Sequence, residues 1–388
     1  MSPKQSLTVL DIQEMISSTL LTEMAYQKRL DNIHNNTLSN SFIPDNDSLP
    51  ELDDVLDHIA RQFSIKNSVQ LRGLTLKEMS ELIFSETSGT PEKMIFFTSG
   101  STGKPTPADS YFSNAWQEIN ALATLFPERK RIVSFVPRHH IYGFLFSILL
   151  PKALSIPAVF KPPLPTPELI LSLSPGDLVI AFPLLWSKLQ KTTANFNNNI
   201  FGVTSTGPCP KETIDGLLNK SLSRMTEVFG SSETGGIGYR HNPSDFYTLL
   251  PHWTKIDENL LERISPVNNQ NTSFSLPDAF EWKDKNKFIP ICRKDKAVQV
   301  AGINVYPTNV ESFFNSLPQV KECSVRLMRP EEGERLKIFI VPTASINSSG
   351  LEKILRKAAS TLSPHEKPGS YAFGSKLPTS DIGKRSDW

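Results

Sequence analysis

The sequence predicts an α/β protein with a large N-terminal domain, built on mostly parallel sheets flanked by helices, and a small C-terminal α+β lid domain. The first observation is an alternation of short β-like runs with helical or loop spans through the middle of the chain, which is typical of a parallel sheet. These runs are 132–136, 158–160, 178–182, 200–203 and 225–229. The second observation is a separate group of two strand-like runs and one helical run near the C-terminus, at 322–328, 336–342 and 351–362.

The N-terminal region is predicted to be helical. Apolar residues recur at the helical period between residues 10 and 20, which predicts a helix from about residue 7 to residue 30. Residues 32–48 are rich in Asn, Asp and Ser and predict a polar loop. Residues 49–83 predict one or two further amphipathic helices.

Composition and charge narrow the class of protein. The chain has 388 residues, of which 38% are hydrophobic and 21% charged, and this predicts two or three domains with a core of ordinary size. A net charge of +1 gives no electrostatic reason to bind nucleic acid or an anionic membrane. The longest apolar run, Ile141 to Leu150, is followed by Pro151 and is too short for a membrane-spanning helix.

The cellular compartment is predicted from the first residues and from the cysteines. The start of the chain lacks the apolar core of a signal peptide. Cys209, Cys292 and Cys323 are scattered and form no CxxC pair, so neither a disulfide framework nor a zinc site is expected. We therefore expect a cytoplasmic protein.

A glycine- and hydroxyl-rich segment predicts phosphate binding. It follows the apolar run 94–97 and consists of Thr98, Ser99, Gly100, Ser101, Thr102, Gly103 and Lys104. Backbone N–H groups and hydroxyls in such a loop can surround a phosphate, and the lysine adds positive charge. A Walker P-loop is excluded, because the two glycines are too close together and Pro105 occupies the position of the magnesium-binding hydroxyl. A Ser/Gly surface turn is the structural alternative.

Four further segments carry residue types suited to chemistry. The segment 136–144 contains His140, next to His139 and among apolar residues. The segment 228–236 contains Ser232 and Glu233 between glycines. Asp278 and Arg293 flank a hairpin-like stretch, and a carboxylate and a guanidinium suit vicinal hydroxyls. The fourth segment, 377–384, ends at Lys384. Each segment alone is also compatible with an ordinary loop.

Taken in order, these segments resemble those of the adenylate-forming superfamily, which comprises acyl- and aryl-CoA synthetases, peptide-synthetase adenylation domains and luciferase. The first segment is similar to the family pattern T-S-G-S-T-G-x-P-K through Pro105, with Thr106 in place of the lysine. The last is similar to L-P-x-T-x-x-G-K and ends at Lys384. The resemblance covers about residues 95 to 384 and implies an AMP-binding enzyme.

The resemblance implies a role for each site residue. The loop 98–104 would hold the departing pyrophosphate, Glu233 would position Mg²⁺, and Ser232 would bind the α-phosphate. Asp278 and Arg293 would bind the ribose. His140 would line the acid pocket, and Lys384 would bridge the attacking carboxylate and the α-phosphate. The resemblance also places a hinge at Asp295, so the domains are predicted at residues 1–294 and 295–388.

The activity implied is ATP-dependent adenylation of a small carboxylic acid, followed by transfer of the acyl group to a thiol. That thiol is coenzyme A or the phosphopantetheine arm of an acyl carrier protein. Two alternatives stay open, a degenerate member that binds nucleotide or acyl-adenylate without full ligase activity, and a CoA-independent enzyme whose acceptor is an amine or a carrier protein. The sequence does not identify the acid, although His140, Tyr142 and Phe144 are compatible with an aromatic one.

Several positions depart from the family pattern. They are Thr106, the Leu276-Pro277 pair before Asp278, and Cys292 before Arg293. In addition, 93 residues precede Met94, where members of the family carry well over a hundred before the phosphate loop. The shortened N-terminal region predicts either a reduced acyl pocket or a homodimer whose partner supplies the missing wall.

Overall fold

The computed structural model describes residues 5–26, 50–98, 106–267, 270–300, 303–329, 331–343 and 348–378. By its internal contacts the chain divides into two compact units. The large unit comprises Met1–Phe97, Pro107–Leu276 and Phe280–Ile289, and the small unit comprises Thr98–Thr106, Pro277–Ala279 and Pro290–Trp388. The expected boundary between residues 294 and 295 stays a prediction.

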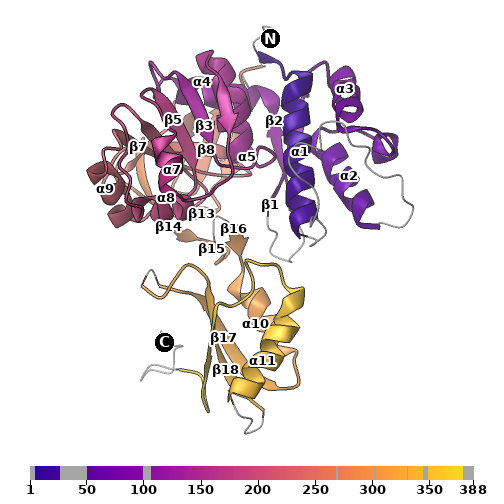
Figure 1. The fold of residues 1–388 in the computed structure, drawn as a ribbon, viewed down its shortest axis with the longest axis vertical. Coiled ribbons are helices and arrows are strands. Elements are labelled where there is room, and N and C mark those ends of the chain that lie inside the picture. Colours follow the sequence, from indigo (N-terminus) through magenta and orange to yellow (C-terminus); the bar gives the residue numbers. More distant parts are fainter. Residues whose placement is uncertain are drawn as a thin grey trace. The chain divides into compact units, whose positions relative to one another are not determined.

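Three helices of the N-terminal region lie beside one another in the large unit (Figure 1). They are α1 (Val9–Tyr26), α2 (Pro50–Gln62) and α3 (Leu76–Thr87), with the short helix η2 (Ser68–Leu71) between the last two. Helix α1 buries Ile12, Met15 and Ile16 completely, as their helical spacing predicts. Helix α3 begins at a capping box in which Thr75 and Glu78 bond each other's backbone N–H groups. The predicted helices are thereby confirmed, and the predicted polar loop 32–48 lies outside the described residues.

A nine-stranded sheet, most of which belongs to the large unit, has the order β13-β14-β9-β8-β7-β6-β5-β3-β4. Its parallel part consists of β3 (Arg131–Ser134), β4 (Ala158–Phe160), β5 (Asp177–Ala181), β6 (Phe201–Thr204) and β7 (Arg224–Ser231). Strand β5 lies in the middle of this part and is buried along its whole length, which explains its unbroken apolar run. The five strand-like runs predicted from the sequence correspond to these strands.

The other half of the sheet departs from a parallel arrangement. Antiparallel pairs join β7 to β8 (Gly235–Arg240), β8 to β9 (Tyr247–Leu249), and β9 to β14 (Lys287–Arg293), with β13 (Asp278–Trp282) at the edge. Two smaller sheets complete the strands of this region: β1 (Lys93–Thr98) with β2 (Thr106–Tyr111), and β10 (Trp253–Lys255), β11 (Leu260–Ile264) and β12 (Asn271–Ser275). The predicted α/β class is confirmed, and the large sheet is mixed.

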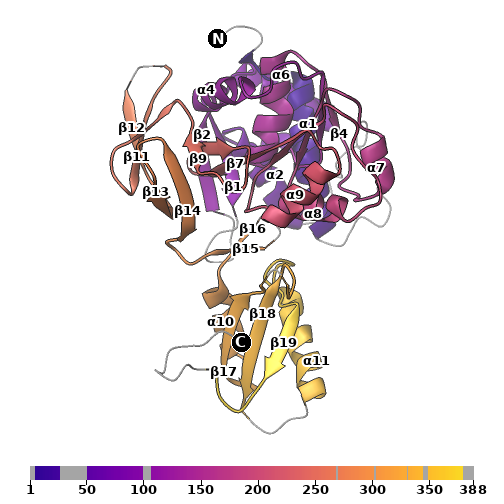
Figure 2. The ribbon, with the colours of Figure 1, turned by 90° about the vertical axis from the view of Figure 1, so that its left-hand side faces the viewer.

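Helices cover both faces of the parallel strands. One core packs α1 to α6 against Ile132, Leu178 and Val203, and the other packs α7, α8 and α9 against Val133 and Val179. Neighbouring positions of one strand therefore face opposite sides, as a strand requires. The covering helices are α4 (Phe112–Ala123), α5 (Ile141–Gly143), the π-helical η3 (Phe144–Leu149), α6 (Leu150–Leu154), α7 (Pro167–Leu171), α8 (Pro183–Gln190) and α9 (Lys211–Asn219). Figures 1 and 2 show α7, α8 and α9 gathered on one side of the sheet.

The small unit contains its own sheet and core. Strands β17 (Val320–Leu327), β18 (Leu336–Pro342) and β19 (Ser370–Phe373) form the sheet, and helices α10 (Pro307–Asn315) and α11 (Ser348–Ala358) cover one of its faces (Figure 2). The two-stranded sheet β15 (Val298–Val300) and β16 (Ile303–Val305) precede them, and the short helix η4 (Ala359–Thr361) follows α11. Phe314 of α10 and Leu355 of α11 are fully buried in this core. The strands and helix predicted near the C-terminus are confirmed.

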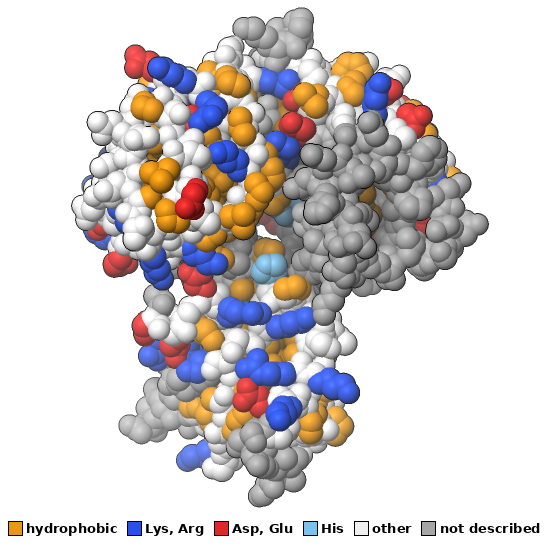
Figure 3. All heavy atoms as spheres, in the orientation of Figure 1, with side chains coloured by type: hydrophobic (Ala, Val, Ile, Leu, Met, Phe, Trp, Pro, Cys, Tyr) orange, Lys and Arg blue, Asp and Glu red, His pale blue; other side chains and the backbone are white. Residues whose placement is uncertain are grey.

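The distribution of charged and apolar side chains can be followed on the surface and along the helices. Figure 3 shows charged and apolar side chains interspersed on the visible face, with Lys and Arg spread over the small unit. Among the helices that the structure describes, none is long and apolar enough to cross a bilayer. The apolar run 141–150 instead forms α5, η3 and the start of α6, and its η3 residues are all buried.

Separate cores predict separable local stability. Leu355→Ala should destabilise the small unit by about 2–5 kcal/mol, because it leaves a cavity in the core beneath α11. Hydrogen exchange should then quicken in β17 and β18, while β3, β5 and β6 keep their wild-type protection. Leu178→Ala, at an equally buried position of β5, is the matched control and should show the reverse pattern. Equal loss of protection in both units for either variant would contradict two independent cores.

Candidate active site

The parallel strands bring several of the predicted segments to one edge of the sheet. The chain leaves β3 toward β4 on one side and leaves β5 toward β6 on the other, so the direction of the connections reverses between β3 and β5. Ligands of open α/β sheets bind at such a point, outside the carboxyl ends of the strands. His140 follows β3, and Glu233 follows β7, at this same edge.

Tyr142 joins the segment after β3 to two neighbouring strands at this edge of the sheet. Its hydroxyl lies 3.0 Å from the carbonyl oxygen of Ala181, at the end of β5, and 3.1 Å from that of Val203 in β6. The side chain is buried, and burial raises the pKa of its phenol well above the ordinary value. The hydroxyl therefore stays protonated and donates, which ties α5 to the ends of two neighbouring strands.

A tight turn presents the two histidines after β3. The N–H of His140 donates to the carbonyl of Pro137 at 3.3 Å, and the N–H of Phe144 donates to the carbonyl of His140 at 2.8 Å. Gly143 lies so close to this turn that a Cβ there would be 1.9 Å from the Pro137 carbonyl oxygen. Only glycine allows this approach, which explains the P-x-x-H-x-x-G spacing in physical terms.

His139 and His140 differ in exposure although their ring centroids lie only 4.2 Å apart. His139 is buried, whereas His140 keeps solvent-accessible surface. The protein atoms around the His140 ring nevertheless displace enough water to lower its pKa to about 4. Burial, with His140 and His58 nearby, lowers the pKa of His139 well below its ordinary value. Both imidazoles are therefore neutral near pH 7, and His140 is the one that a ligand can reach.

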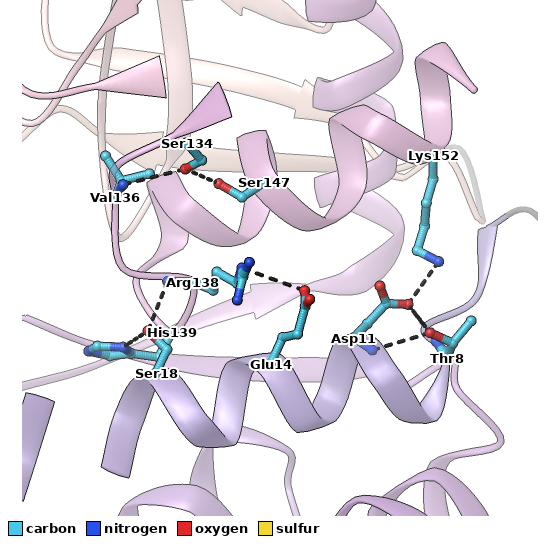
Figure 4. Close-up of polar contacts among 10 residues, drawn as sticks. All are labelled: Thr8, Asp11, Glu14, Ser18, Ser134, Val136, Arg138, His139, Ser147 and Lys152. Carbon is cyan, nitrogen blue, oxygen red and sulfur yellow. Dashed lines mark hydrogen bonds and ion pairs between the residues drawn. The ribbon is translucent and has the colours of Figure 1, made fainter. Parts of the chain in front are cut away.

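Helices α1 and α2 hold this turn in place, and Figure 4 shows the contacts of Ser18 in α1. Ser18 of α1 accepts a hydrogen bond from the N–H of Arg138 at 3.0 Å, and its hydroxyl lies 2.8 Å from Nδ1 of His139. The amide of the fully buried Gln62 in α2 donates to the carbonyl of His139 at 2.8 Å. The backbone and the ring of His139 are thus held from two helices, which orients the adjacent His140.

Two ion pairs join α1 to this loop and to α6, as Figure 4 also shows. The guanidinium of Arg138 lies 3.5 Å from the carboxylate of Glu14, and the ammonium of Lys152 lies 2.8 Å from that of Asp11. Burial raises the pKa of Glu14, and the attraction of Arg138 only partly opposes this. The Glu14–Arg138 pair orients the loop against α1, and the Asp11–Lys152 pair joins α6 to the same helix.

Ser232 and Glu233 lie at the tip of the turn between β7 and β8. Ser231 pairs with Gly235 across the hairpin, so only three residues form the loop. The hydroxyls of Ser231 and Thr234 lie 3.0 Å apart and bond each other's backbone N–H groups at 3.3 Å. Glu233 is exposed and Ser232 is half-buried, so both are accessible at the carboxyl end of β7.

A buried carboxylate lies directly behind this turn. Glu118 of α4 is 2% exposed, and its Oε1 accepts a hydrogen bond from the N–H of Gly236 at 2.9 Å. Burial raises its pKa to about 7, against the lowering effect of Arg263 and of the Gly236 N–H. Arg263 and His252 are the charged or titratable groups that share this interior, and burial lowers the pKa of His252 to about 3.

Asp278 and Arg293 belong to the small unit, and a backbone hydrogen bond joins the residues next to them. The N–H of Lys294 donates to the carbonyl of Pro277 at 3.0 Å, which joins the two segments. Asp278 is buried, and the Arg293 guanidinium binds Asp295 through both nitrogens, at 3.1 and 2.6 Å. Hydrogen bonds from Arg293, together with those from the Ala297 N–H and the Tyr306 hydroxyl, lower the pKa of Asp295 to about 2. A ribose contact by Asp278 and Arg293 stays a prediction.

The remaining predicted residues are those of the loop 98–104 and Lys384. Ser99, Gly100, Ser101, Thr102, Gly103 and Lys104 connect β1 to β2 and lie outside the described residues, as does Lys384. Thr98 is the last residue of β1. Among the described residues, no group of three or more His, Cys, Asp or Glu side chains is arranged to hold a metal ion.

Sequence reasoning missed Glu118, Ser18 and Gln62. Glu118 could have been found, because it falls on the apolar stripe of α4 with Ala115 and Leu122, where a carboxylate is unexpected. Ser18 and Gln62 carry no such signal. Each is an ordinary polar residue of an amphipathic helix, and its partner is known only once the chain is folded.

Comparison with known proteins identifies the family. The chain is 33% identical over 311 residues to a 4-coumarate–CoA ligase of Halorhodospira halophila, a match that covers 79% of this chain and 78% of the relative. It is 35% identical over 300 residues to a 4-coumarate–CoA ligase of Rhodobacter capsulatus, covering 76% of this chain and 75% of the relative. The similar coverage on both sides shows that these relatives are about as long as this chain. A scan against models of protein families gave no match.

Solved structures agree on the fold. A double mutant of the o-succinylbenzoate CoA synthetase of Bacillus subtilis superposes with a TM-score of 0.59 at 17% identity, over 75% of this chain and 67% of that one. The chain therefore belongs to the adenylate-forming, AMP-binding superfamily. It is an ATP-dependent acyl- or aryl-adenylate-forming ligase, which activates a carboxylate as its adenylate and passes it to a thiol. The relatives give no support to the degenerate, nucleotide-binding alternative.

The contact between Ser18 and the histidine turn gives one prediction. Ser18→Ala removes the partner of the Arg138 N–H and of the His139 ring, and should lower the free energy of unfolding by about 1–3 kcal/mol. Ser17→Ala, at the adjacent half-buried position, is the control and should stay within about 0.5 kcal/mol of wild type. Denaturant unfolding measures both variants. Equal stability of the two variants would show that Ser18 does not hold the turn.

The raised pKa of Glu118 gives a second prediction, in the pH dependence of stability. Between pH 4.5 and about 7 the folded protein keeps the Glu118 proton while the unfolded chain has lost it, so the free energy of unfolding falls as pH rises. At about 1.4 kcal/mol for each pH unit, the fall attributable to this group is on the order of 3 kcal/mol. Glu118→Gln should lack this component, so its stability relative to wild type should rise across the same interval. Parallel stability curves for the two proteins would contradict the burial of an ionisable Glu118.

Proposed function

We propose that this ligase activates an aryl acid of the 4-coumarate class and transfers it to coenzyme A, with Mg²⁺ as the metal cofactor. The observation that carries the proposal is the match of three quarters or more of the chain to two ligases whose names specify 4-coumarate and CoA. The carboxyl ends of the parallel strands provide a place for both the acid and the nucleotide.

In the first step the acid would react with ATP. A carboxylate oxygen attacks the α-phosphorus, the bond from that phosphorus to the β-phosphate bridging oxygen breaks, and pyrophosphate leaves with that electron pair. This chemistry depends on placing the reactants in line and on stabilising phosphate charge, rather than on a protein nucleophile. A neutral His140 can form a hydrogen bond with the acid without adding a charge to the site.

Residues on the β7–β8 turn suit the phosphate and its metal. Mg²⁺ takes oxygen ligands and is commonly held by one or two carboxylates together with substrate phosphates. Glu233 supplies an exposed carboxylate and Ser232 a hydroxyl, both at the carboxyl end of β7. When bound, the ion would neutralise charge on the phosphates, with Glu233 holding it and Ser232 bonding the α-phosphate.

The other roles follow from the family to which the chain belongs. The loop 98–104 would bind the pyrophosphate, Asp278 and Arg293 the ribose, and Lys384 the reacting carboxylate and α-phosphate. Arg293 would bind ribose from a position in which it already contacts Asp295. In the second step the sulfur of the thiol attacks the acyl carbon, its proton leaves, and the bond to the AMP oxygen breaks. Movement of the small unit about Asp295 would bring the thiol to the adenylate.

Three points of the proposal go beyond family membership: the acceptor, the oligomeric state and the location. Coenzyme A is favoured as acceptor over the phosphopantetheine arm of a carrier protein, because the two relatives are CoA ligases. Assembly as a homodimer and a cytoplasmic location are further proposals, which rest on the sequence expectations alone.

A screen of acids by ATP–pyrophosphate exchange tests the proposal. Hydroxycinnamates should support exchange at least about tenfold better, in kcat/KM, than aliphatic acids of similar length, because an apolar aromatic pocket discriminates by a few kcal/mol. Glu233→Gln should lower exchange with every acid. Thioester formation is then measured with CoA and with a phosphopantetheinylated carrier protein in parallel. Preference for an aliphatic acid, or transfer to the carrier protein alone, would contradict the proposed substrate or acceptor respectively.

A further inference from the structure

The hydroxyls of Ser231 and Thr234 hold the first part of the β7–β8 turn, and the two glycines that follow are the part with most freedom. Gly235 has a backbone angle φ of +71°, in the left-handed region that favours glycine. Gly236 follows it, and the register of the hairpin shifts between Phe229 and Gly230. Because glycine has the largest conformational freedom of any residue, contacts from outside the turn add most at Gly235 and Gly236, where they restrict the backbone to one conformation.

Those contacts come from Glu118 on one side of the Gly236 peptide and from Trp253 on the other. The Gly236 N–H donates to Oε1 of Glu118 at 2.9 Å, and the Gly236 carbonyl accepts from the indole N–H of Trp253 at 2.8 Å. Helix α4, which carries Glu118, packs directly against β8 (Figure 1).

The carboxylate also occupies the space that side chains would fill at the two glycines. A Cβ at Gly235 would be 2.4 Å from Oε2 of Glu118, and a Cβ at Gly236 would be 2.6 Å from Oε1. The Glu118 carboxylate therefore has room only because residues 235 and 236 are glycines. Replacing either side of this contact changes the path of the chain that leads into Ser232 and Glu233.

A purely structural role does not require a carboxylate here. Burying a carboxyl group costs free energy, and an apolar residue of similar size in an apolar helix face is often as stable or more stable. Arg263 offsets part of this cost by its charge, while its own guanidinium binds Gln117 at 2.8 Å and the Asn114 carbonyl. A costly group that contacts one turn, the turn with the candidate metal ligand, points to a role in the reaction.

We propose that Glu118 is a positioning residue of the ligase, which fixes the β7–β8 turn so that Ser232 and Glu233 meet the magnesium nucleotide. The inference rests on the proposed roles of Ser232 and Glu233. Glu118 itself touches neither substrate nor metal, and it acts through the Gly235–Gly236 backbone.

The experiment measures the Mg²⁺ concentration that gives half-maximal ATP–pyrophosphate exchange, with MgCl₂ as the probe and the full chain as the enzyme. Glu118→Leu removes the acceptor of the Gly236 N–H and should raise this concentration about tenfold, with the KM of the acid within about twofold of wild type. Glu118→Gln keeps an acceptor oxygen and should raise it only about threefold. Ile119→Val, at the adjacent fully buried position of α4, is the control and should change neither value by more than about twofold.

The same variants in a Glu233→Gln background separate this inference from the proposed function. If Glu118 acts through the turn, its replacement adds little once Glu233 is gone, because effects within one unit are not additive. An unchanged Mg²⁺ requirement in Glu118→Leu, with a raised one in Glu233→Gln, overturns the inference alone. An unchanged requirement in Glu233→Gln overturns the proposed metal site. If Glu118→Leu does not fold, Glu118→Gln decides, and a wild-type Mg²⁺ requirement in that variant overturns the inference.

Discussion

The candidate site depends on one constraint, the parallel pairing of β3, β5, β6 and β7. Parallel strands end at the same edge of a sheet, so whatever follows each strand is brought to one place regardless of its separation in sequence. The histidine turn after β3 and the turn after β7 are nearly a hundred residues apart, on the order of a whole small domain. Both nevertheless lie at the carboxyl edge, where the chain reverses its winding direction. The antiparallel half of the sheet begins at this edge, at the turn that carries Glu233.

Buried polar groups fix the conformation of the segments at that edge, at a cost in stability. Tyr142, Gln62, His139 and Glu118 are all removed from water, and each makes a hydrogen bond that fixes an element beside the site. Their partners are the β5 and β6 carbonyls for Tyr142, the His139 carbonyl for Gln62, Ser18 of α1 for His139 and the Gly236 N–H for Glu118. Such contacts contribute little net stability and are expensive to leave incomplete. Their value is geometric, since they hold loops that contain glycine and proline in one conformation. The N-terminal helices, which contain none of the residues assigned from the family motifs, take part in this through Ser18 and Gln62.

Much of the fold could be predicted from the sequence, because the information is local. Strands such as β4 and β18 were predicted at their observed bounds from short apolar runs, and α1 from its buried stripe. The mixed character of the large sheet could not be predicted, since strand pairing joins distant segments. For the site, the motif order led to His140, Ser232 and Glu233, and the family is confirmed by the relatives. Glu118 was visible as a carboxylate on an apolar helix face, but its partner lies 118 residues away. The roles of the loop 98–104 and of Lys384 stay predictions.

The central claim is that the carboxyl edge of β3 to β7 is where acid and nucleotide meet. A crystal structure of the protein with a stable analogue of a hydroxycinnamoyl-adenylate tests it most directly. The account predicts the aryl group in contact with His140, and the α-phosphate mimic within hydrogen-bonding distance of Ser232, with both at the carboxyl ends of the parallel strands. An analogue bound at the opposite edge of the sheet, or away from both turns, would contradict the account.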